Sequence, residues 1–145
     1  KGLILLVEDN PDDEMLALRA FKKNGIDNKV LVLRNGADAI DFLFCQGTFS
    51  DRNQRDLPAV VLLDLKLPKK DGIEVLKEIR DNPVTALLPV VILTSSNTEQ
   101  DLIASYKCGA NSYIRKPVDF EQFMEAVRQM GIYWLFLNER PKDPS

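Results

Sequence analysis

The chain has 145 residues, of which 45% are hydrophobic, and a formal net charge of −3 at pH 7. This length and composition fit one domain with a hydrophobic core and exclude a disordered chain. The charge gives no basic surface for nucleic acid, and the apolar runs are too short to span a membrane. Two distant cysteines fit reduced thiols, so we expect a cytoplasmic protein.

Histidine does not occur in the sequence. Its absence removes the commonest metal ligand and the commonest general base near neutral pH. A zinc site, a serine-hydrolase triad and a phosphohistidine donor are therefore poor fits. Any chemistry in this chain must use carboxylates, hydroxyls, lysine and a bound ion.

The first half of the chain alternates between apolar runs and helical patterns. Residues 3–7 are apolar and predict a buried strand. Asn10-Pro11 then favours a helix start, because Asn caps helices and Pro suits their first turn. The elements that follow are a helix to about residue 24, a strand at 29–33 and a helix at 36–46.

Residues 47–58 form a polar, charged connection that is long for a compact domain. Two interpretations stay open at this point. The segment is either a loop that contacts a partner or a solvated insertion.

The central strand is predicted at residues 59–64 and ends in Asp64. A run that is apolar on both faces is typical of a strand buried between two helical layers. The elements that follow are a loop at 65–72, a helix ended by Asn82-Pro83, a strand at 89–93, a helix to Cys108, a strand at 111–115, and a last helix with Asp119 and Gln122 as a capping box.

Five β-α units in strict alternation predict an α/β fold: a doubly wound parallel sheet with helices on both faces. The flavodoxin-like strand order 2-1-3-4-5 would place the first and third strands side by side. Ligands bind at the carboxyl edge of such sheets, so the residues that follow the strands are the candidates for a site.

Four strand ends then point to one place. They carry Glu8 and Asp9, Asp64, Thr94 and Lys116. Converging carboxylates imply a cation, and hard oxygen ligands suit Mg²⁺. A lysine and a hydroxyl beside the cation suggest a bound phosphoryl group. Each residue alone is better explained as a turn or a cap, but their common position favours a site.

Two further acids, Asp12 and Asp13, follow in the first turn of the first predicted helix. Acids at that place are favoured by the helix dipole. We interpret both as first-turn acids without a role in the site.

With these residues the chain resembles a bacterial response-regulator receiver domain over about residues 3–130. The resemblance rests on Glu8-Asp9, on Leu62-Leu63-Asp64 followed by Pro68 and Asp71-Gly72, on Thr94-Ser95, and on Lys116-Pro117. It implies a receiver domain at residues 1–130 and an extension of the last helix at residues 131–145.

The resemblance assigns metal-binding and phosphoryl-accepting roles to residues that follow the first and third predicted strands. Asp64 would be the phosphoacceptor, and it would bind Mg²⁺ together with Asp9 and the main-chain carbonyl of Lys66. Glu8 stands where many receivers have Asp, and it would act on the metal through water. In the family, the positions of Lys66 and Ser96 tune the decay of the phosphoryl group.

The resemblance also assigns the switch. Thr94 would contact the phosphoryl group in the active state, and Lys116 would pair with it. Tyr113 matches the aromatic residue that turns inward as Thr94 moves, and the bond before Pro117 is expected to be cis.

The function implied is a single-domain response regulator that takes a phosphoryl group from a sensor histidine kinase, and not an enzyme that turns over an external substrate. One alternative is a Mg²⁺-dependent aspartyl phosphatase, which usually has a second Asp where this chain has Lys66. Another is an interaction adapter that no longer accepts phosphate. The presence of Asp64, Thr94 and Lys116 argues against the adapter.

The last predicted helix has apolar residues at heptad spacing that continue beyond the usual end of a receiver. An apolar extension of this kind either folds back onto the domain or pairs with a second copy of the chain, and we expect the second outcome, a homodimer. The expected dimer interface comprises Phe120, Phe123, Val127, Met130, Tyr133, Trp134, Phe136 and Leu137. In its extension and its long 47–58 loop, the chain also resembles the stand-alone regulators that partner phytochrome-class sensor kinases.

Overall fold

The computed structural model describes residues 2–116 and 120–130. Its centre is one parallel sheet with the strand order β2-β1-β3-β4-β5. The strands are β1 (Ile4–Val7), β2 (Val30–Leu33), β3 (Val60–Leu63), β4 (Val90–Thr94) and β5 (Ser112–Arg115). The predicted doubly wound fold and its strand order are confirmed.

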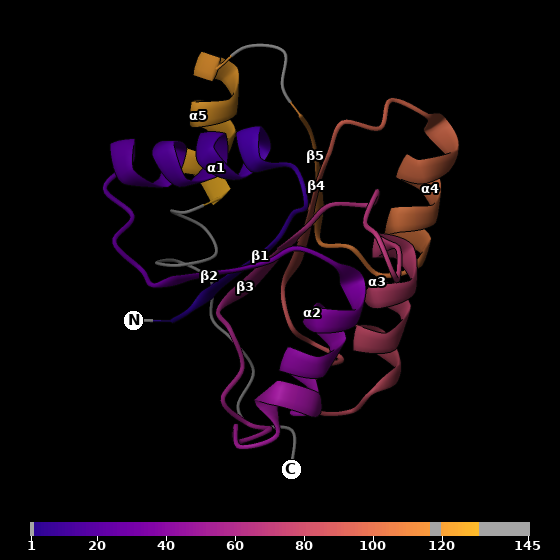
Figure 1. The fold of residues 1–145 in the computed structure, drawn as a ribbon. Helices are drawn as coiled ribbons and strands as arrows, with labels where there is room; N and C mark the ends of the chain where they lie inside the picture. The colour runs from indigo at the N-terminus through magenta and orange to yellow at the C-terminus, as the bar shows by residue number, and fades with distance from the viewer. Residues whose placement is uncertain (1, 117–119, 131–145) are drawn as a thin grey trace.

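Helices cover both faces of the sheet, with α1 and α5 on one side and α2, α3 and α4 on the other (Figure 1). The helices are α1 (Pro11–Lys23), α2 (Gly36–Leu43), α3 (Gly72–Asp81), α4 (Glu99–Lys107) and α5 (Phe120–Met130), with a short 3-10 turn η1 (Gly47–Phe49) after α2.

The two helical layers explain why the central strands are apolar throughout. Leu5 and Val7 of β1 pack into the core under α2 and α3. Ile4 and Leu6 point the other way, into the core under α1 and α5. All four are at most 1% exposed, and burying each such side chain contributes about 1.5–3 kcal/mol.

The register of the strands brings their carboxyl ends to one edge. Val7 of β1 lies opposite Leu63 of β3, so the residues that follow them, Glu8 and Asp64, emerge side by side. Thr94 ends β4 opposite Arg115 of β5. The sheet therefore fixes the relative positions of side chains that are far apart in the sequence.

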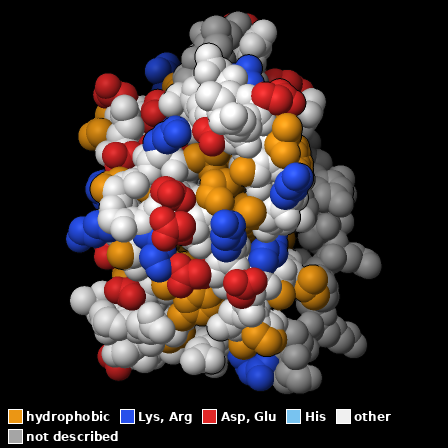
Figure 2. All heavy atoms as spheres, turned by 90° about the vertical axis from the view of Figure 1, so that its right-hand side faces the viewer, with side chains coloured by type: hydrophobic (Ala, Val, Ile, Leu, Met, Phe, Trp, Pro, Cys, Tyr) orange, Lys and Arg blue, Asp and Glu red, His pale blue; other side chains and the backbone are white. Residues whose placement is uncertain are grey.

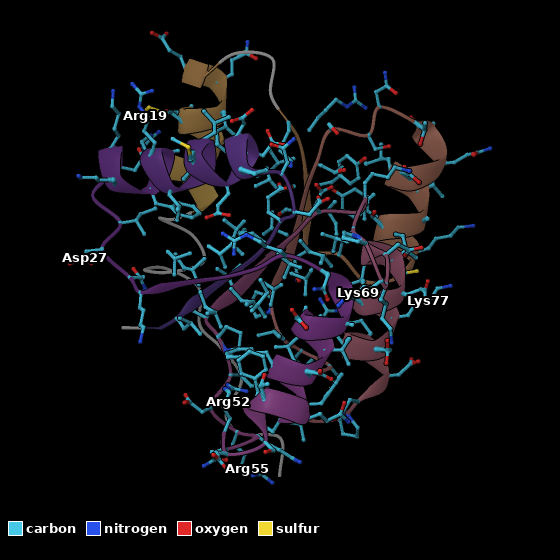
Figure 3. The ribbon with its side chains drawn as sticks, viewed as in Figure 1. Arg19, Asp27, Arg52, Arg55, Lys69 and Lys77 are labelled. Atoms are coloured by element: carbon cyan, nitrogen blue, oxygen red, sulfur yellow. The ribbon has the colours of Figure 1, made fainter. Side chains whose placement is uncertain are left out.

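Helix α2 ends at Leu43, earlier than the predicted end at residue 46. Cys45 has a φ of 56°, which lies in the left-handed region and cannot continue a right-handed helix. The connection after it is partly anchored: the Arg52 guanidinium lies 3.7 Å from the centre of the Phe42 ring and donates to the Phe42 carbonyl. Figure 3 shows Arg52 beside α2, and its loop leads into the start of β3, at the opposite edge from Asp64.

Helix α5 packs on α1 through Phe123 and Val127, which are 4% and 2% exposed. Both side chains are buried in the core of one chain, so they are not free to contact a second chain directly. The expected dimer interface is therefore left with the other predicted residues. Several predicted features lie outside the described residues: the side chains of Phe120 and Met130, the extension at residues 131–145, the expected cis bond before Pro117, and the Asp119 cap.

The surface over α3 and α4 mixes acidic and basic side chains around a strip of apolar ones (Figure 2). Ile103 and Tyr106 of α4 are large apolar residues that are 45% and 51% exposed. Among the helices of the described part of the chain, none has the length and apolar character that a membrane crossing requires.

Candidate functional site

Three carboxylates meet at the carboxyl edge of the sheet. Glu8, Asp9 and Asp64 each place an oxygen atom within 4.8 Å of the others. Glu8 and Asp64 are 2% and 5% exposed, whereas Asp9 is exposed. Three oxygen donors, one of them open to solvent, suit a hard divalent cation that keeps part of its water. The structure therefore brings together the acids that the sequence predicted.

Lys116 is the cation of this pocket. Its Nζ donates to Asp64 Oδ2 at 3.1 Å and also to Glu8 Oε1. Burial alone would lower the pKa of Lys116, but the hydrogen bond to Glu8 and the charge of Asp64 outweigh it, and the pKa is raised. The ammonium group is therefore held charged beside the carboxylate of Asp64. Its pairing with a phosphoryl group stays a prediction.

Glu8 carries the least favourable charge of the pocket. Burial raises the pKa of Glu8 to about 7, although the Lys116 hydrogen bond and charge act to lower it. The nearby charge of Asp64 raises the pKa further. A cation in the pocket would relieve this repulsion, because metal binding favours the deprotonated carboxylate.

Asp13 is the site residue that sequence reasoning missed. Its Oδ2 accepts a hydrogen bond of 3.0 Å from Lys116 Nζ. The interpretation of Asp13 as only a first-turn acid is thus incomplete. No sequence signal announced this contact, because the helix dipole alone explains an acid in the first turn of α1.

The turn between β1 and α1 is ordered by the predicted cap. The side chain of Asn10 accepts from the backbone N–H groups of Asp12 at 2.9 Å and Asp13 at 3.2 Å. The backbone N–H of Asn10 donates to Glu8 Oε2 at 3.2 Å. The cap therefore orients both Glu8 and the first turn that carries Asp13.

The loop after β3 holds Asp64 through its backbone. The N–H of Lys66 donates to Asp64 Oδ1 at 3.2 Å. Gly72 lies so close that a Cβ atom there would stand 2.3 Å from the Asp64 carbonyl oxygen, so only glycine fits. The Lys66 carbonyl as a metal ligand stays a prediction.

Thr94 and Tyr113 meet at Ser96. Thr94 is fully buried, and its Oγ1 accepts from the Ser96 N–H at 3.3 Å. The Tyr113 hydroxyl donates to the Ser96 carbonyl at 3.3 Å. The two residues that the resemblance assigned to the switch are therefore joined through one residue between them.

Asp101 of α4 is a second residue without a sequence signal. Its Oδ2 accepts from Ser96 Oγ at 2.5 Å and lies 3.5 Å from Lys66 Nζ. A cavity of about 440 Å³ is lined in part by Asp9 of the acidic cluster and by Lys66 and Asp101. The site thus has an open side large enough for a phosphoryl group, with α4 along one wall.

The comparison with protein families gives one matching family, the response regulator receiver domain, over residues 4–128. Among curated proteins, the probable methanogenesis regulatory protein FilR2 of Methanothrix harundinacea is 42% identical over 139 residues, which cover 96% of this chain and 87% of that protein. Response regulator Rcp1 of Synechocystis sp. is 41% identical over 133 residues, which cover 92% of this chain and 88% of Rcp1.

Solved structures of similar proteins give the same result. The crystal structure of the Mn²⁺-bound form of Rcp1 matches with a TM-score of 0.86 at 40% identity, covering 97% of this chain and 99% of that chain. The phosphorylated cyanobacterial phytochrome response regulator RcpA matches with a TM-score of 0.87 at 35% identity, with the same coverage of 97% and 99%.

Proposed function

The chain belongs to the response regulator receiver family, and from that membership we propose that it accepts a phosphoryl group on Asp64 from the phosphohistidine of a sensor histidine kinase. The observation that carries the assignment to Asp64 is its position in the pocket. Two carboxylates of the acidic cluster, Glu8 and Asp64, lie next to Lys116 Nζ, and Asp64 is the one that directly follows the central strand β3.

The reaction is a transfer between two nucleophiles. A carboxylate oxygen of Asp64 attacks phosphorus, and the bond between phosphorus and the kinase imidazole nitrogen breaks, with its electron pair left on that nitrogen. The product is an acyl phosphate, one form of covalent nucleophilic catalysis. Lys116 keeps its proton and its charge, and it balances the charge of the phosphoryl oxygens as they arrive.

The acidic pocket fits Mg²⁺. Asp9, Asp64 and the main-chain carbonyl of Lys66 would hold it directly, and Glu8 would act through water. When bound, the ion offsets negative charge on the phosphoryl oxygens. The convergence of three carboxylates on one point supports this assignment.

The switch uses the residues around Ser96. Thr94 donates its hydroxyl to the phosphoryl group, and Tyr113 changes position as Thr94 moves. The surface that changes is the face of α4, β5 and α5. The exposed Ile103 and Tyr106 on α4 give that face apolar groups for a partner.

The named relatives support a narrower partner. RcpA is a cyanobacterial phytochrome response regulator, and this chain aligns with 99% of its length. We therefore assign a phytochrome-class histidine kinase as the donor, in the cytoplasm. We also propose a homodimer through the extension of the last helix, in which Phe123 and Val127 support the interface from inside the core.

Intact-mass measurement tests the phosphoacceptor. The protein is incubated with a small acyl-phosphate donor and Mg²⁺, and one added phosphoryl group is expected. The adduct is expected to be lost in Asp64→Asn and under metal chelation, and to remain in Asp81→Asn, a matched change of an exposed acid on α3. An adduct that persists in Asp64→Asn, or no adduct with any donor or kinase, would overturn the assignment.

A further inference from the structure

Two loops at the mouth of the site are joined to the first turn of α4 by one carboxylate oxygen. Asp101 Oδ2, on the first turn of α4, accepts from Ser96 Oγ at 2.5 Å and lies 3.5 Å from Lys66 Nζ. Ser96 follows β4, and Lys66 follows the phosphoacceptor at the end of β3. We name this set the Ser96–Asp101–Lys66 bridge.

Solvent exposure separates the two arms of the bridge. The side chains of Lys66 and Asp101 are 68% and 26% exposed, and an exposed ion pair of this kind contributes little by itself. The other arm is different, because Ser96 is buried and gives a charge-assisted hydrogen bond. That hydrogen bond is the first cause of a lowered pKa of Asp101, with the nearby Lys66 charge adding to it.

The buried arm leads directly to the switch. The Ser96 N–H donates to Thr94 Oγ1 at 3.3 Å, and the Ser96 carbonyl accepts from the Tyr113 hydroxyl at 3.3 Å. If Thr94 moves toward a phosphoryl group on Asp64, Ser96 must follow it or lose that acceptor. The Ser96 hydroxyl also donates to Asp101, so a movement of Ser96 would stretch or break that hydrogen bond.

The exposed arm leads to the phosphoacceptor. The backbone N–H of Lys66 already donates to Asp64 Oδ1 at 3.2 Å, while its ammonium group is drawn to Asp101. A phosphoryl group on Asp64 is a second anion that competes for this ammonium. Removing the Asp101 carboxylate would free Lys66 to turn toward it.

We propose that Asp101 is a positioning residue that opposes activation, because it holds Ser96 and Lys66 in the positions seen here. The proposal rests on the proposed function of Asp64. It adds that α4 is tied to the site by a specific side chain, so that the strength of the bridge sets how readily the receiver switches.

Beryllofluoride, a mimic of the phosphoryl group, provides the first test. Its affinity in the presence of Mg²⁺ is measured by titration calorimetry for the full chain and for Asp101→Ala and Ser96→Ala. Each substitution is expected to tighten binding about tenfold, a common size for coupling between sites. Glu99→Ala removes an exposed acid from the same helical turn and is expected to bind as wild type, which controls for charge and helix dipole.

The double variant Ser96→Ala/Asp101→Ala distinguishes an action of Asp101 through Ser96 from a general repulsion between Asp101 and the bound anion. If Asp101 acts through Ser96, the double variant is expected to bind no more tightly than Asp101→Ala. If Asp101 acts only by repelling anions, Ser96→Ala is expected to bind beryllofluoride as wild type does, or the gains in affinity of the two single variants are expected to multiply in the double variant. Either result would show that the proposal is wrong. Adding Lys66→Gln to Asp101→Ala is expected to reverse the part of the gain that comes from the freed ammonium.

A measurement without any phosphoryl chemistry keeps the two proposals distinguishable. Backbone hydrogen exchange at residues 95–98 of the unliganded protein is expected to be about tenfold faster in Asp101→Ala and Ser96→Ala than in Glu99→Ala. Equal exchange in all three overturns the bridge. Failure of wild type to bind beryllofluoride instead overturns the proposed function of Asp64, and the exchange result then decides the bridge alone.

Discussion

The Asp13 carboxylate lies 3.0 Å from the Lys116 ammonium, across 103 positions of the sequence. Lys116 also pairs with Glu8 and Asp64, both of which belong to the acidic cluster. Asp13 is therefore the partner of Lys116 that remains available when the cluster is taken up by a cation. Its expected role is to keep the ammonium group pointed at the phosphoacceptor.

Replacing Asp13 with Asn tests that role. The rate of phosphorylation by a small acyl-phosphate donor is expected to fall about threefold to tenfold, because the neutral amide holds Lys116 less firmly. The affinity for Mg²⁺, measured by calorimetry, is expected to change little. Asp12→Asn is the control, since Asp12 is exposed and adjacent. Equal rates in the two variants would contradict the role of Asp13.

Lys116→Met is expected to destabilise the metal-free protein by about 3 kcal/mol at pH 8. The reason is that Glu8 and Asp64 stay buried without their cation. Added Mg²⁺ is expected to recover most of this loss, because it supplies the missing positive charge. Urea unfolding with and without Mg²⁺ measures both effects. A variant that is as stable as wild type in chelator would show that the acids are not strained.

The raised pKa of Glu8 makes stability depend on pH. The pKa of Glu8 is about 7 in the folded protein, against 4.5 for the carboxyl group in the unfolded chain. Between these two pH values, the folded state therefore holds a proton that the unfolded state has released. Stability is therefore lost as pH rises through this window, by about 3 kcal/mol at ~1.4 kcal/mol per pKa unit. Below pH 4.5 this contribution is fully present.

Glu8→Gln is expected to remove that dependence. The difference in unfolding free energy between Glu8→Gln and wild type, without metal, should grow in favour of the variant from pH 4.5 to above pH 7. Urea unfolding at several pH values measures the difference. A difference that stays constant with pH would mean that Glu8 remains charged throughout the window.

Arg80 joins α3 to the end of α4 and the start of β4. Its guanidinium donates to the carbonyls of Gly109 at 2.7 and 2.9 Å and of Leu88 at 2.7 Å. Arg80→Lys cannot reproduce this fork and is expected to lower the free energy of unfolding by about 2 kcal/mol. Arg34→Lys, which alters a partly exposed pair with Glu14, is expected to cost under about 0.5 kcal/mol. Equal losses would show that the fork adds nothing.

Truncation after Met130 tests the dimer. The full chain is expected to sediment as a dimer, and the chain without residues 131–145 as a monomer. Phe123 and Val127 are core residues, so the truncated protein is expected to stay folded by circular dichroism. A full chain that is monomeric before and after phosphorylation would remove the dimer hypothesis.

The sequence was sufficient for the fold and for most of the site because the signals involved are local. Apolar runs marked the strands, and the residues just after them, such as Asp64 and Lys116, were placed by the general geometry of parallel sheets. Element ends were less predictable. The early end of α2 depends on the left-handed backbone at Cys45, which no pattern in its sequence announces.

Asp13 and Asp101 were missed for a different reason. Each has a sufficient local explanation as an acid in the first turn of a helix. Their second partners, Lys116 and Lys66, lie far away in sequence, and only the packing of α1 and α4 against the sheet brings them within reach. Contacts that depend on where a helix packs cannot be predicted from the residues that follow the strands alone.

The pocket is assembled from both ends of the chain, since Glu8 and Lys116 are separated by 108 positions. During synthesis Asp64 leaves the ribosome well before Lys116 does, and a chain cleaved between them keeps the acceptor but not its cation. With Asp64 as the proposed phosphoacceptor, phosphorylation is expected to require β5 in place, because Lys116 directly follows β5. A copy that ends before Lys116 is therefore expected to transmit no signal, so phosphorylation would report that the whole sheet has formed.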